Sequence, residues 1–200
     1  MPNTAFKIRT NDKTGSIKTI EHNVISFDKL WDAYPTSRVT HKDPSTGNDV
    51  FSDHCAINVS QALYDNGVLM KSFRGTRCWR CPTPSPEGKG VHAIRAQELA
   101  DYLAKRPFAG CPVATVMSGA DFEEKISGKQ GIVFFQNYWQ RPGESGRTGD
   151  HIDLWKNNRL ASLGFFASQM RLTFPDVSEQ YLSMSNLKRA SKVLFWDMSE

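Results

Sequence analysis

The cysteine with the most informative setting in this sequence is Cys55, which stands at the expected start of a helix. Apolar residues follow it at helical spacing as far as Leu63, and Asn66-Gly67 offers a suitable stop. Unpaired N–H groups and the macrodipole at a helix start stabilise a thiolate. Cys55 is therefore a candidate nucleophile, with the alternative that it is a small buried hydrophobe, as most unpaired cysteines are.

A nucleophilic thiol needs a base within hydrogen-bond reach, and the chain has five histidines. His22 and His41 lie in polar segments and His92 in a glycine-rich approach to a helix, so these three are expected at the solvated surface. His54 adjoins the nucleophile, but sequence neighbours at a helix start point apart, so it is expected to tune the local field or face solvent. His151 begins a strand after a glycine-rich loop, which holds its backbone firmly, and it is the predicted base.

An imidazole base needs a third group to fix its tautomer, and Asp153 is the nearest acidic candidate. Strand alternation places His151 and Asp153 on one face, with Cα atoms about 6.5 Å apart. Ile152 and Leu154 point to the other face and are expected in the core. Ser162, across the expected hairpin, is the competing orienting residue, and a surface cation or a substrate amine is the alternative partner of Asp153.

The pair Cys78 and Cys81 has the spacing of a redox motif or of half a zinc site. A zinc site needs two more ligands at matching spacing, and Cys55 and Cys111 do not supply them. A redox motif would precede a helix in a βαβ unit, whereas prolines follow this pair. We therefore expect a local disulfide or two free thiols, and we predict no metal site and no cofactor.

Composition favours one compact domain over residues 1–200, with 39% hydrophobic residues and a formal net charge of +4. Basic residues are not clustered as in a nucleic-acid tail, so nucleic acid is not an expected partner. We expect no secretory signal peptide and no membrane insertion, because apolar runs are short. The four cysteines exclude a dense disulfide framework.

These residues must be positioned by helices and strands. Along the chain most of the expected helices come before the expected strands, which is the α+β pattern. Residues 36–53 and 78–90 are rich in turn formers and are expected to be surface loops. Strands 131–136 and 151–155 are expected, with 131–136 central, and Asn157-Asn158 turns the chain from the second strand toward 159–163. These pieces suggest an antiparallel meander. Further helices are expected over 26–34, 96–103, 121–126 and 178–190, and a closing strand is expected over 192–197. The helix that carries Cys55 is expected to be capped by Ser52 or Asp53 and to end at residue 65.

Two motifs resemble those of the type VI secretion amidase effectors of the fourth family. They are Asp53-His-Cys55-Ala-Ile-Asn-Val-Ser60-Gln-Ala-Leu63 and Gly149-Asp-His151-Ile-Asp-Leu-Trp155. A helix like 97–103, a strand like 131–136 and a closing strand like 194–196 occur in the same order in that family, so the resemblance spans most of residues 27–197.

The resemblance implies an NlpC-like, papain-type fold that hydrolyses the amide between γ-D-glutamate and meso-diaminopimelate in peptidoglycan stem peptides. Cys55 would be acylated and His151 would be its base. It also implies synthesis in the donor cytoplasm without a signal peptide, delivery by the type VI secretion apparatus to the target-cell periplasm, and a cognate immunity protein as partner. Where some family members have a third catalytic Asp, this chain has Ser162, and Asp153 is our prediction for that role.

Two other functions fit the same residues. A papain-like cysteine hydrolase or deamidase could use the same pair on a different amide. A non-enzymatic binding module would carry Cys55 only as a buried residue.

Overall fold

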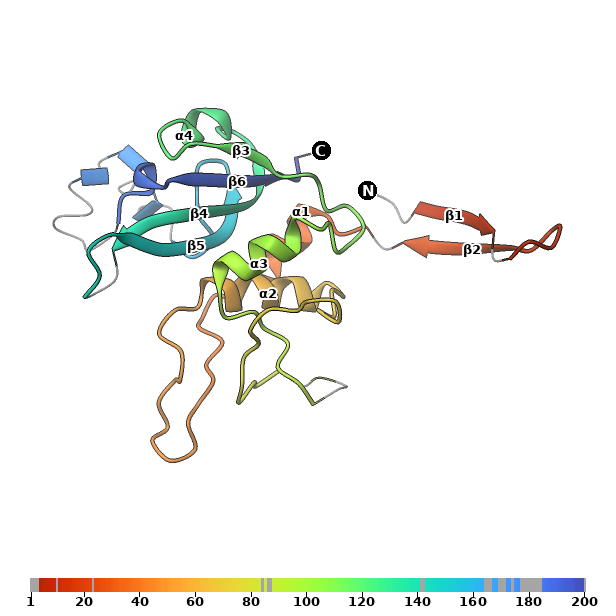
Figure 1. Cartoon of the computed structure of the whole chain (residues 1–200), viewed down its shortest axis with the longest axis horizontal. Coiled ribbons are helices and arrows are strands. Elements are labelled where there is room, and N and C mark those ends of the chain that lie inside the picture. The colour runs from red at the N-terminus through yellow and green to blue at the C-terminus, as the bar shows by residue number, and fades with distance from the viewer. Residues whose placement is uncertain are drawn as a thin grey trace.

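The fold is described from a computed structural model of the chain. It describes residues 4–9, 11–22, 24–83, 85, 88–140, 143–163, 167–168, 172–173, 175–176 and 185–199. Helices and strands are labelled as in Figure 1.

A four-stranded antiparallel sheet forms one layer of the molecule, in the order β3-β6-β4-β5. Its strands are β3 (Thr115–Met117), β4 (Gln130–Gln140), β5 (Arg147–Lys156) and β6 (Lys192–Asp197). The apolar and β-branched run 132–135 is buried within β4, which lies between β6 and β5, so the prediction of a central strand is confirmed. β4 and β5 form the expected hairpin, and β6 then pairs with β4 from the other side.

The helices lie mostly before the sheet in the chain, which confirms the α+β class. They are α1 (Phe27–Asp32), α2 (Cys55–Asp65), α3 (Ala96–Leu103), α4 (Phe122–Lys125) and the 3-10 helix η1 (Leu187–Arg189). The predicted cap of α2 was wrong: the N-cap residue is His54, and no side chain caps the helix there. α2 begins too late for Ser52 or Asp53 to cap it, and the hydroxyl of Ser52 instead donates to Asp53.

Part of one predicted helix cannot be compared with the structure. Of the predicted span 178–190, residues 178–184 lie outside the described residues, and 185–190 contain only η1.

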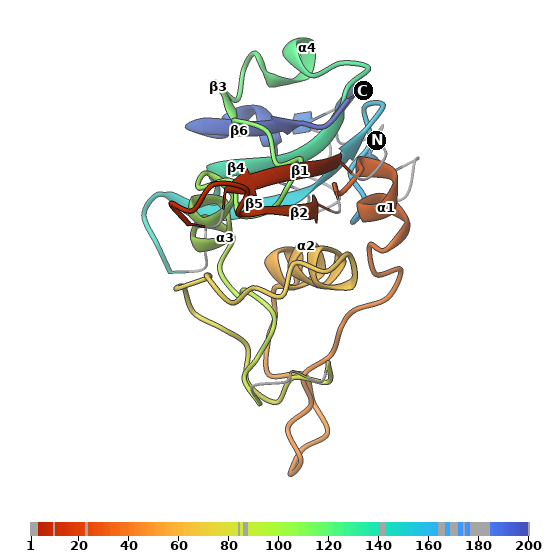
Figure 2. The same ribbon diagram turned by 90° about the vertical axis from the view of Figure 1, so that its right-hand side faces the viewer.

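Two apolar clusters pack on the two faces of the sheet. Ile152 and Leu154 belong to the cluster shared with α1, α2 and α3, as predicted from strand alternation. Trp155 belongs to the other cluster, with Phe122 of α4 and Phe195 of β6. The pair α2 and α3 is thus held against β5, the strand that carries the candidate base (Figures 1 and 2).

Two long connections, residues 33–54 and 66–95, lie on the side of α2 away from the sheet (Figures 1 and 2). Their described residues contain no helix or strand, only the isolated bridges Lys42↔Asp49 and Arg77↔Ala93. Both nevertheless bury polar side chains, because His41 and His92 are each 0% exposed. The prediction that these two histidines are solvated was therefore wrong.

A hairpin of β1 (Thr4–Arg9) and β2 (Ile17–His22) projects from the body of the molecule (Figure 1). We had not predicted it, although apolar and basic residues alternate over 6–9. The backbone of His22 ends β2, and its side chain lies outside the described part of the chain. Among the described residues, the helices are too short or too polar to cross a membrane.

Candidate active site

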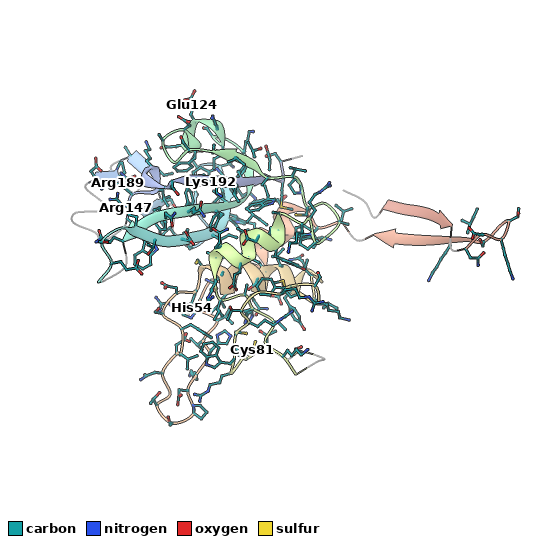
Figure 3. All side chains as sticks on the ribbon, viewed as in Figure 1. His54, Cys81, Glu124, Arg147, Arg189 and Lys192 are labelled. Carbon is teal, nitrogen blue, oxygen red and sulfur yellow. The ribbon has the colours of Figure 1, made fainter. Side chains whose placement is uncertain are left out.

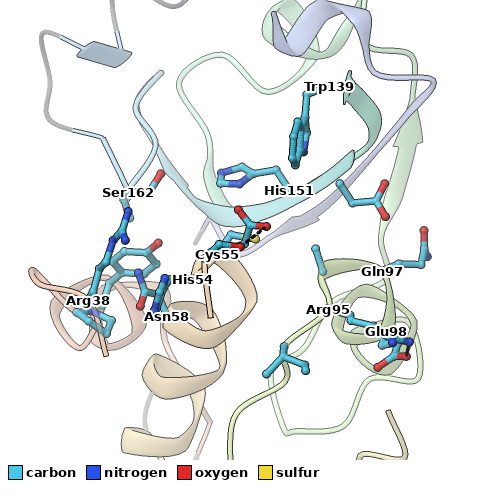
Figure 4. Close-up of a pocket in the computed structure, with 18 of the residues that line it drawn as sticks. Arg38, His54, Cys55, Asn58, Arg95, Gln97, Glu98, Trp139, His151 and Ser162 are labelled. Carbon is cyan, nitrogen blue, oxygen red and sulfur yellow. Dashed lines mark hydrogen bonds and ion pairs between the residues drawn. The ribbon is translucent and has the colours of Figure 1, made fainter. Parts of the chain in front are cut away.

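Cys55 is the first residue of α2 and is partly exposed in a pocket of about 870 Å³. The pocket is also lined by residues from the first long connection, the end of the second, α3, both strands of the β4–β5 hairpin and residues 161–162. Figure 4 shows His151 above Cys55, with Ser162 on one side and Gln97 and Glu98 of α3 on the other. The hypothesis that Cys55 is a buried core thiol is therefore wrong.

His151 lies on β5, and its side chain is 13% exposed. Its Nε2 is 3.3 Å from Oδ2 of Asp153, and its ring packs near Phe135 and Tyr138. Burial by itself lowers the pKa of His151, but the charge of Tyr138 and hydrogen bonds with Asp153 and Cys55 outweigh burial and raise it well above 6.5. The fold thus favours an imidazolium beside the thiol.

The carboxylate of Asp153 is fully buried behind His151. It accepts a hydrogen bond from the backbone N–H of Leu154 at 2.8 Å. The backbone N–H of Ser162 lies 3.3 Å from both of its oxygens, and the Ser162 hydroxyl donates to Oδ2. Both candidate orienting residues are therefore present in one network: Asp153 contacts the histidine, and Ser162 contacts Asp153.

Three buried polar atoms at the pocket have no hydrogen-bond partner among the described residues: Tyr34 Oη, Asn58 Oδ1 and His54 Nδ1. The pKa of Tyr34 is raised, first by burial and then by the charge of Asp153. Sequence reasoning missed Tyr34, which it placed only as the last residue of the helix expected over 26–34, and it missed Asn58. The distance of Asn58 from Cys55 along the helix could have revealed it, because a residue three positions after Cys55 lies on the same helix face.

His54 is 8% exposed, so of the two expectations for it, that it tunes the local field or that it faces solvent, the second was wrong. Its Nε2 is 2.7 Å from Oδ2 of Asp49. The same carboxylate accepts from the backbone N–H groups of His41 and Phe51, which help to lower the pKa of Asp49. Asp49 therefore ties the first long connection to the start of α2.

His41 and His92 do not line the pocket. They meet Cys78 and Cys81 between the two long connections, and all four cysteines of the chain are free thiols. Of the two expectations for Cys78 and Cys81, the structure has free thiols rather than a disulfide. The spacing of the cysteines along the chain offers no further zinc ligands, but the fold brings His41 and His92 to Cys78 and Cys81.

The chain was also compared with known protein families. A family model described as type VI secretion system, amidase effector protein 4 matches residues 51–196. This chain belongs to that family. The match includes Cys55, His151, Asp153 and Ser162, and it confirms the resemblance seen in the two motifs.

Membership fixes the general activity. The chain is a type VI secretion amidase effector that acts on peptidoglycan, and its site of action is the periplasm of the target cell. The α+β architecture with an antiparallel four-stranded sheet is compatible with the NlpC-like, papain-type fold expected for this family. A search of curated proteins found no match to the chain.

Proposed function

We propose that this effector is a cysteine amidase that cleaves the amide between γ-D-glutamate and meso-diaminopimelate in stem peptides. Cys55 is the nucleophile, His151 the general base and acid, and Asp153 the orienting residue. The observation that carries the proposal is the arrangement at the head of α2: a partly exposed thiol, a histidine hydrogen-bonded to it, and a buried carboxylate on the far side of that histidine.

The hydrogen bonds of His151 decide which of its ring nitrogens can act on Cys55. Nε2 of His151 contacts Asp153, so Nδ1 is the nitrogen available to exchange a proton with Cys55. The thiolate attacks the amide carbon, the C–N bond breaks, and His151 gives its proton to the leaving amine of diaminopimelate. His151 then takes a proton from water, which attacks the thioester and frees the D-glutamyl carboxylate and Cys55.

The oxyanion formed in both steps needs hydrogen-bond donors near Cys55. The backbone N–H of Asn58 already donates to the carbonyl oxygen of His54 at 2.8 Å. The N–H groups of Cys55, Ala56 and Ile57 come before it in the first turn, where a helix offers no backbone acceptors. Because no side chain caps this end, these donors support an oxyanion hole, with the N–H of Cys55 the nearest to the reacting carbon.

The rim of the pocket suits a substrate with carboxylates. Arg38 is exposed at the pocket and forms no ion pair among the described residues. Arg95 also lines the pocket, but it is paired with Glu98 at 3.1 Å. We assign Arg38 to a free carboxylate of the stem peptide, because a guanidinium binds a carboxylate through two parallel hydrogen bonds.

Two further parts of the proposal rest on the family. The producing cell makes the chain in its cytoplasm without a signal peptide. A cognate immunity protein protects that cell by binding the effector.

The test is mass analysis of muropeptides from purified sacculi. The parent chain is expected to release products cut between D-glutamate and diaminopimelate, and Cys55→Ala to lower the rate by about 10⁴-fold. Cys111→Ala is the matched control, because Cys111 is buried away from the pocket with its Sγ 3.6 Å from the carbonyl oxygen of Leu103. Equal cleavage by Cys55→Ala would overturn the mechanism, and cleavage at another amide, or deamidation, would overturn the assigned bond.

A further inference from the structure

Four side chains from three separate segments converge on the side of α2 that faces the long connections. Their potential ligand atoms, His41 Nε2, Cys78 Sγ, Cys81 Sγ and His92 Nδ1, all lie within 4.8 Å of one another. His41 and His92 are fully buried, Cys78 is 4% exposed and Cys81 is half-buried. We call these four residues the Cys2His2 cluster, and Figure 3 labels Cys81 within it.

The spacing of these atoms matches the edges of a metal-centred tetrahedron. With zinc–nitrogen bonds near 2.05 Å and zinc–sulfur bonds near 2.3 Å, the edges are about 3.3 Å between two nitrogens and about 3.5 Å between nitrogen and sulfur. The two histidine nitrogens are 3.1 Å apart. Nδ1 of His92 is 3.4 Å from each of the two sulfurs.

The outer nitrogens of both rings face carbonyl oxygens. Nδ1 of His41 is 3.0 Å from the backbone oxygen of Val39, and Nε2 of His92 is 2.6 Å from the side-chain oxygen of Gln61. Carbonyl oxygens only accept, so each outer nitrogen carries a proton, and a neutral ring then presents a lone pair at its inner nitrogen. Two lone pairs 3.1 Å apart repel unless a proton or a metal ion lies between them. A proton would bridge only the two nitrogens, whereas a metal ion would coordinate both nitrogens and both sulfurs.

We propose that His41, Cys78, Cys81 and His92 bind one structural zinc ion. Two thiolates and two neutral imidazoles match the ligand preference and four-coordinate geometry of zinc, and two thiolate charges balance Zn²⁺ in a buried site. All four positions are filled by side chains, which leaves none for water or substrate. The ion is therefore structural and takes no part in the hydrolysis.

The backbone around the cluster is shaped to hold sulfur. The N–H of His92 donates to Sγ of Cys78 at 3.4 Å, which stabilises a thiolate there. Gly90 passes so close that a Cβ at this position would lie 1.9 Å from the backbone oxygen of Cys78 and 2.7 Å from its Sγ. Only glycine fits this approach without a shift of the backbone.

The position of the cluster explains how two connections without regular structure are held in place. His41 comes from the first connection, the other three ligands come from the second, and Gln61 joins His92 to α2. An ion pair between Arg80 and Asp43 and ring contact between Phe51 and Trp79 join the same two connections.

The link continues to the active site. The backbone N–H of His41 donates to Asp49, whose other carboxylate oxygen meets His54, the residue before Cys55. Zinc at the cluster would thus fix the loop that forms one wall of the substrate pocket.

The test measures bound metal on the full chain with Cys55→Ala, grown with added zinc and purified under reducing conditions. Elemental analysis is expected to find about one zinc per chain. Cys78→Ser and Cys81→Ser should lose it, while Cys111→Ser, the same change at a buried thiol outside the cluster, should retain it. Zinc absent from the parent, or lost equally from Cys111→Ser, would overturn the proposal.

Cobalt(II) gives a second measurement that needs no substitution at the cluster. After removal of zinc, the refilled chain should show the visible bands of tetrahedral cobalt and a thiolate-to-cobalt charge-transfer band. An octahedral spectrum without that band would overturn the site. The outcome is separate from the amidase proposal, because Cys55→Ala removes hydrolysis and leaves the metal ligands untouched.

Discussion

Among the described residues, a thiol and an imidazole lie together at two places beside α2. At the start of α2, Cys55 meets His151, and six residues further along the helix Gln61 contacts the Cys2His2 cluster. The two sites differ in the group that contacts the second ring nitrogen of each histidine, the one turned away from the thiols. His151 faces the carboxylate of Asp153, whereas both cluster histidines face carbonyl oxygens.

This difference separates the roles that we propose for the two sites, a nucleophile with its base at Cys55 and a set of metal ligands at the Cys2His2 cluster. Despite its burial, the pKa of His151 is raised, first by the charge of Tyr138 and then by hydrogen bonds with Asp153 and Cys55, which favours the protonated ring that the proposed mechanism requires. A carbonyl oxygen fixes the neutral tautomer and leaves the inner lone pair for a metal ion. Solvent exposure differs between the two sites in the same way, because Cys55 lines the open pocket while His41 and His92 are fully buried.

The largest expected effect comes from removing the carboxylate. Asp153→Asn should lower kcat on sacculi by about 10³- to 10⁴-fold, because the amide does not stabilise an imidazolium. Asp28→Asn is the matched control, since Asp28 is exposed and pairs with Lys156. Near-parental turnover in Asp153→Asn would show that the active-site histidine needs no charged partner, and the contrast between the two sites would fail.

The pH dependence sharpens the same point. The pKa of His151 is raised above 6.5 in the fold, so its proton contributes stability that is complete below pH 6.5 and is lost as pH rises through the raised value. Activity should fall over that same alkaline range, as the proton for the leaving amine is lost. In Asp153→Asn the alkaline limb of the kcat/KM profile should move to lower pH, and an unmoved limb would contradict the assignment.

The next effect, on stability, should appear only at the Cys2His2 cluster. When free zinc is present at a thousand times its Kd, bound zinc should add about 4 kcal/mol to the free energy of unfolding. Removing it with a chelator should therefore lower Tm by about 10 °C. Calorimetry of the Cys55→Ala chain checks this, with Cys81→Ser, already without zinc, as the control that chelator should not shift. An equal shift in both chains would mean that the chelator acts elsewhere.

Alkylation should separate the two kinds of thiol by about 100-fold in rate. Iodoacetamide near neutral pH should label Cys55 first, because it is partly exposed in the pocket, and leave Cys111 unmodified in its buried position. Cys78 and Cys81 should become reactive only after chelation. Peptide mass analysis over time gives the order, and early labelling of the cluster thiols in zinc-loaded protein would contradict their role as ligands.

The smallest expected effect concerns Ser162. Ser162→Ala removes one hydroxyl from Asp153 but keeps the backbone N–H, so kcat should fall by about tenfold. Ser118→Ala is a close control, because the hydroxyl of Ser118 donates to the exposed carboxylate of Asp121 at 2.7 Å. A loss as large as that of Asp153→Asn would make Ser162 the principal orienting residue.

Local sequence patterns located many elements well. The bounds of α3 and β6 agree with the predicted spans, because each has a clear apolar pattern between turn-forming residues. The N-terminal hairpin and β3 were missed. β3 is three residues long, too short for alternation to show, and its place depends on pairing with β6.

The candidate nucleophile and base were visible in the sequence because each depends on its own element. Cys55 begins α2 as predicted, where a helix start favours a thiolate. His151 lies on the predicted strand, but that strand begins at Arg147, so the prediction that His151 starts it was wrong. The family match then showed an amidase effector. The roles of Cys55 and His151 within it stay predictions.

Only the tertiary structure decided which residues those elements bring together. It placed Asp153 against His151 with Ser162 behind it, a choice that alternation along one strand left open. It also buried His41 and His92 beside Cys78 and Cys81, across 51 positions of sequence between the histidines. Residues so distant along the chain approach only where packing closes two long loops, and no local pattern encodes that closure.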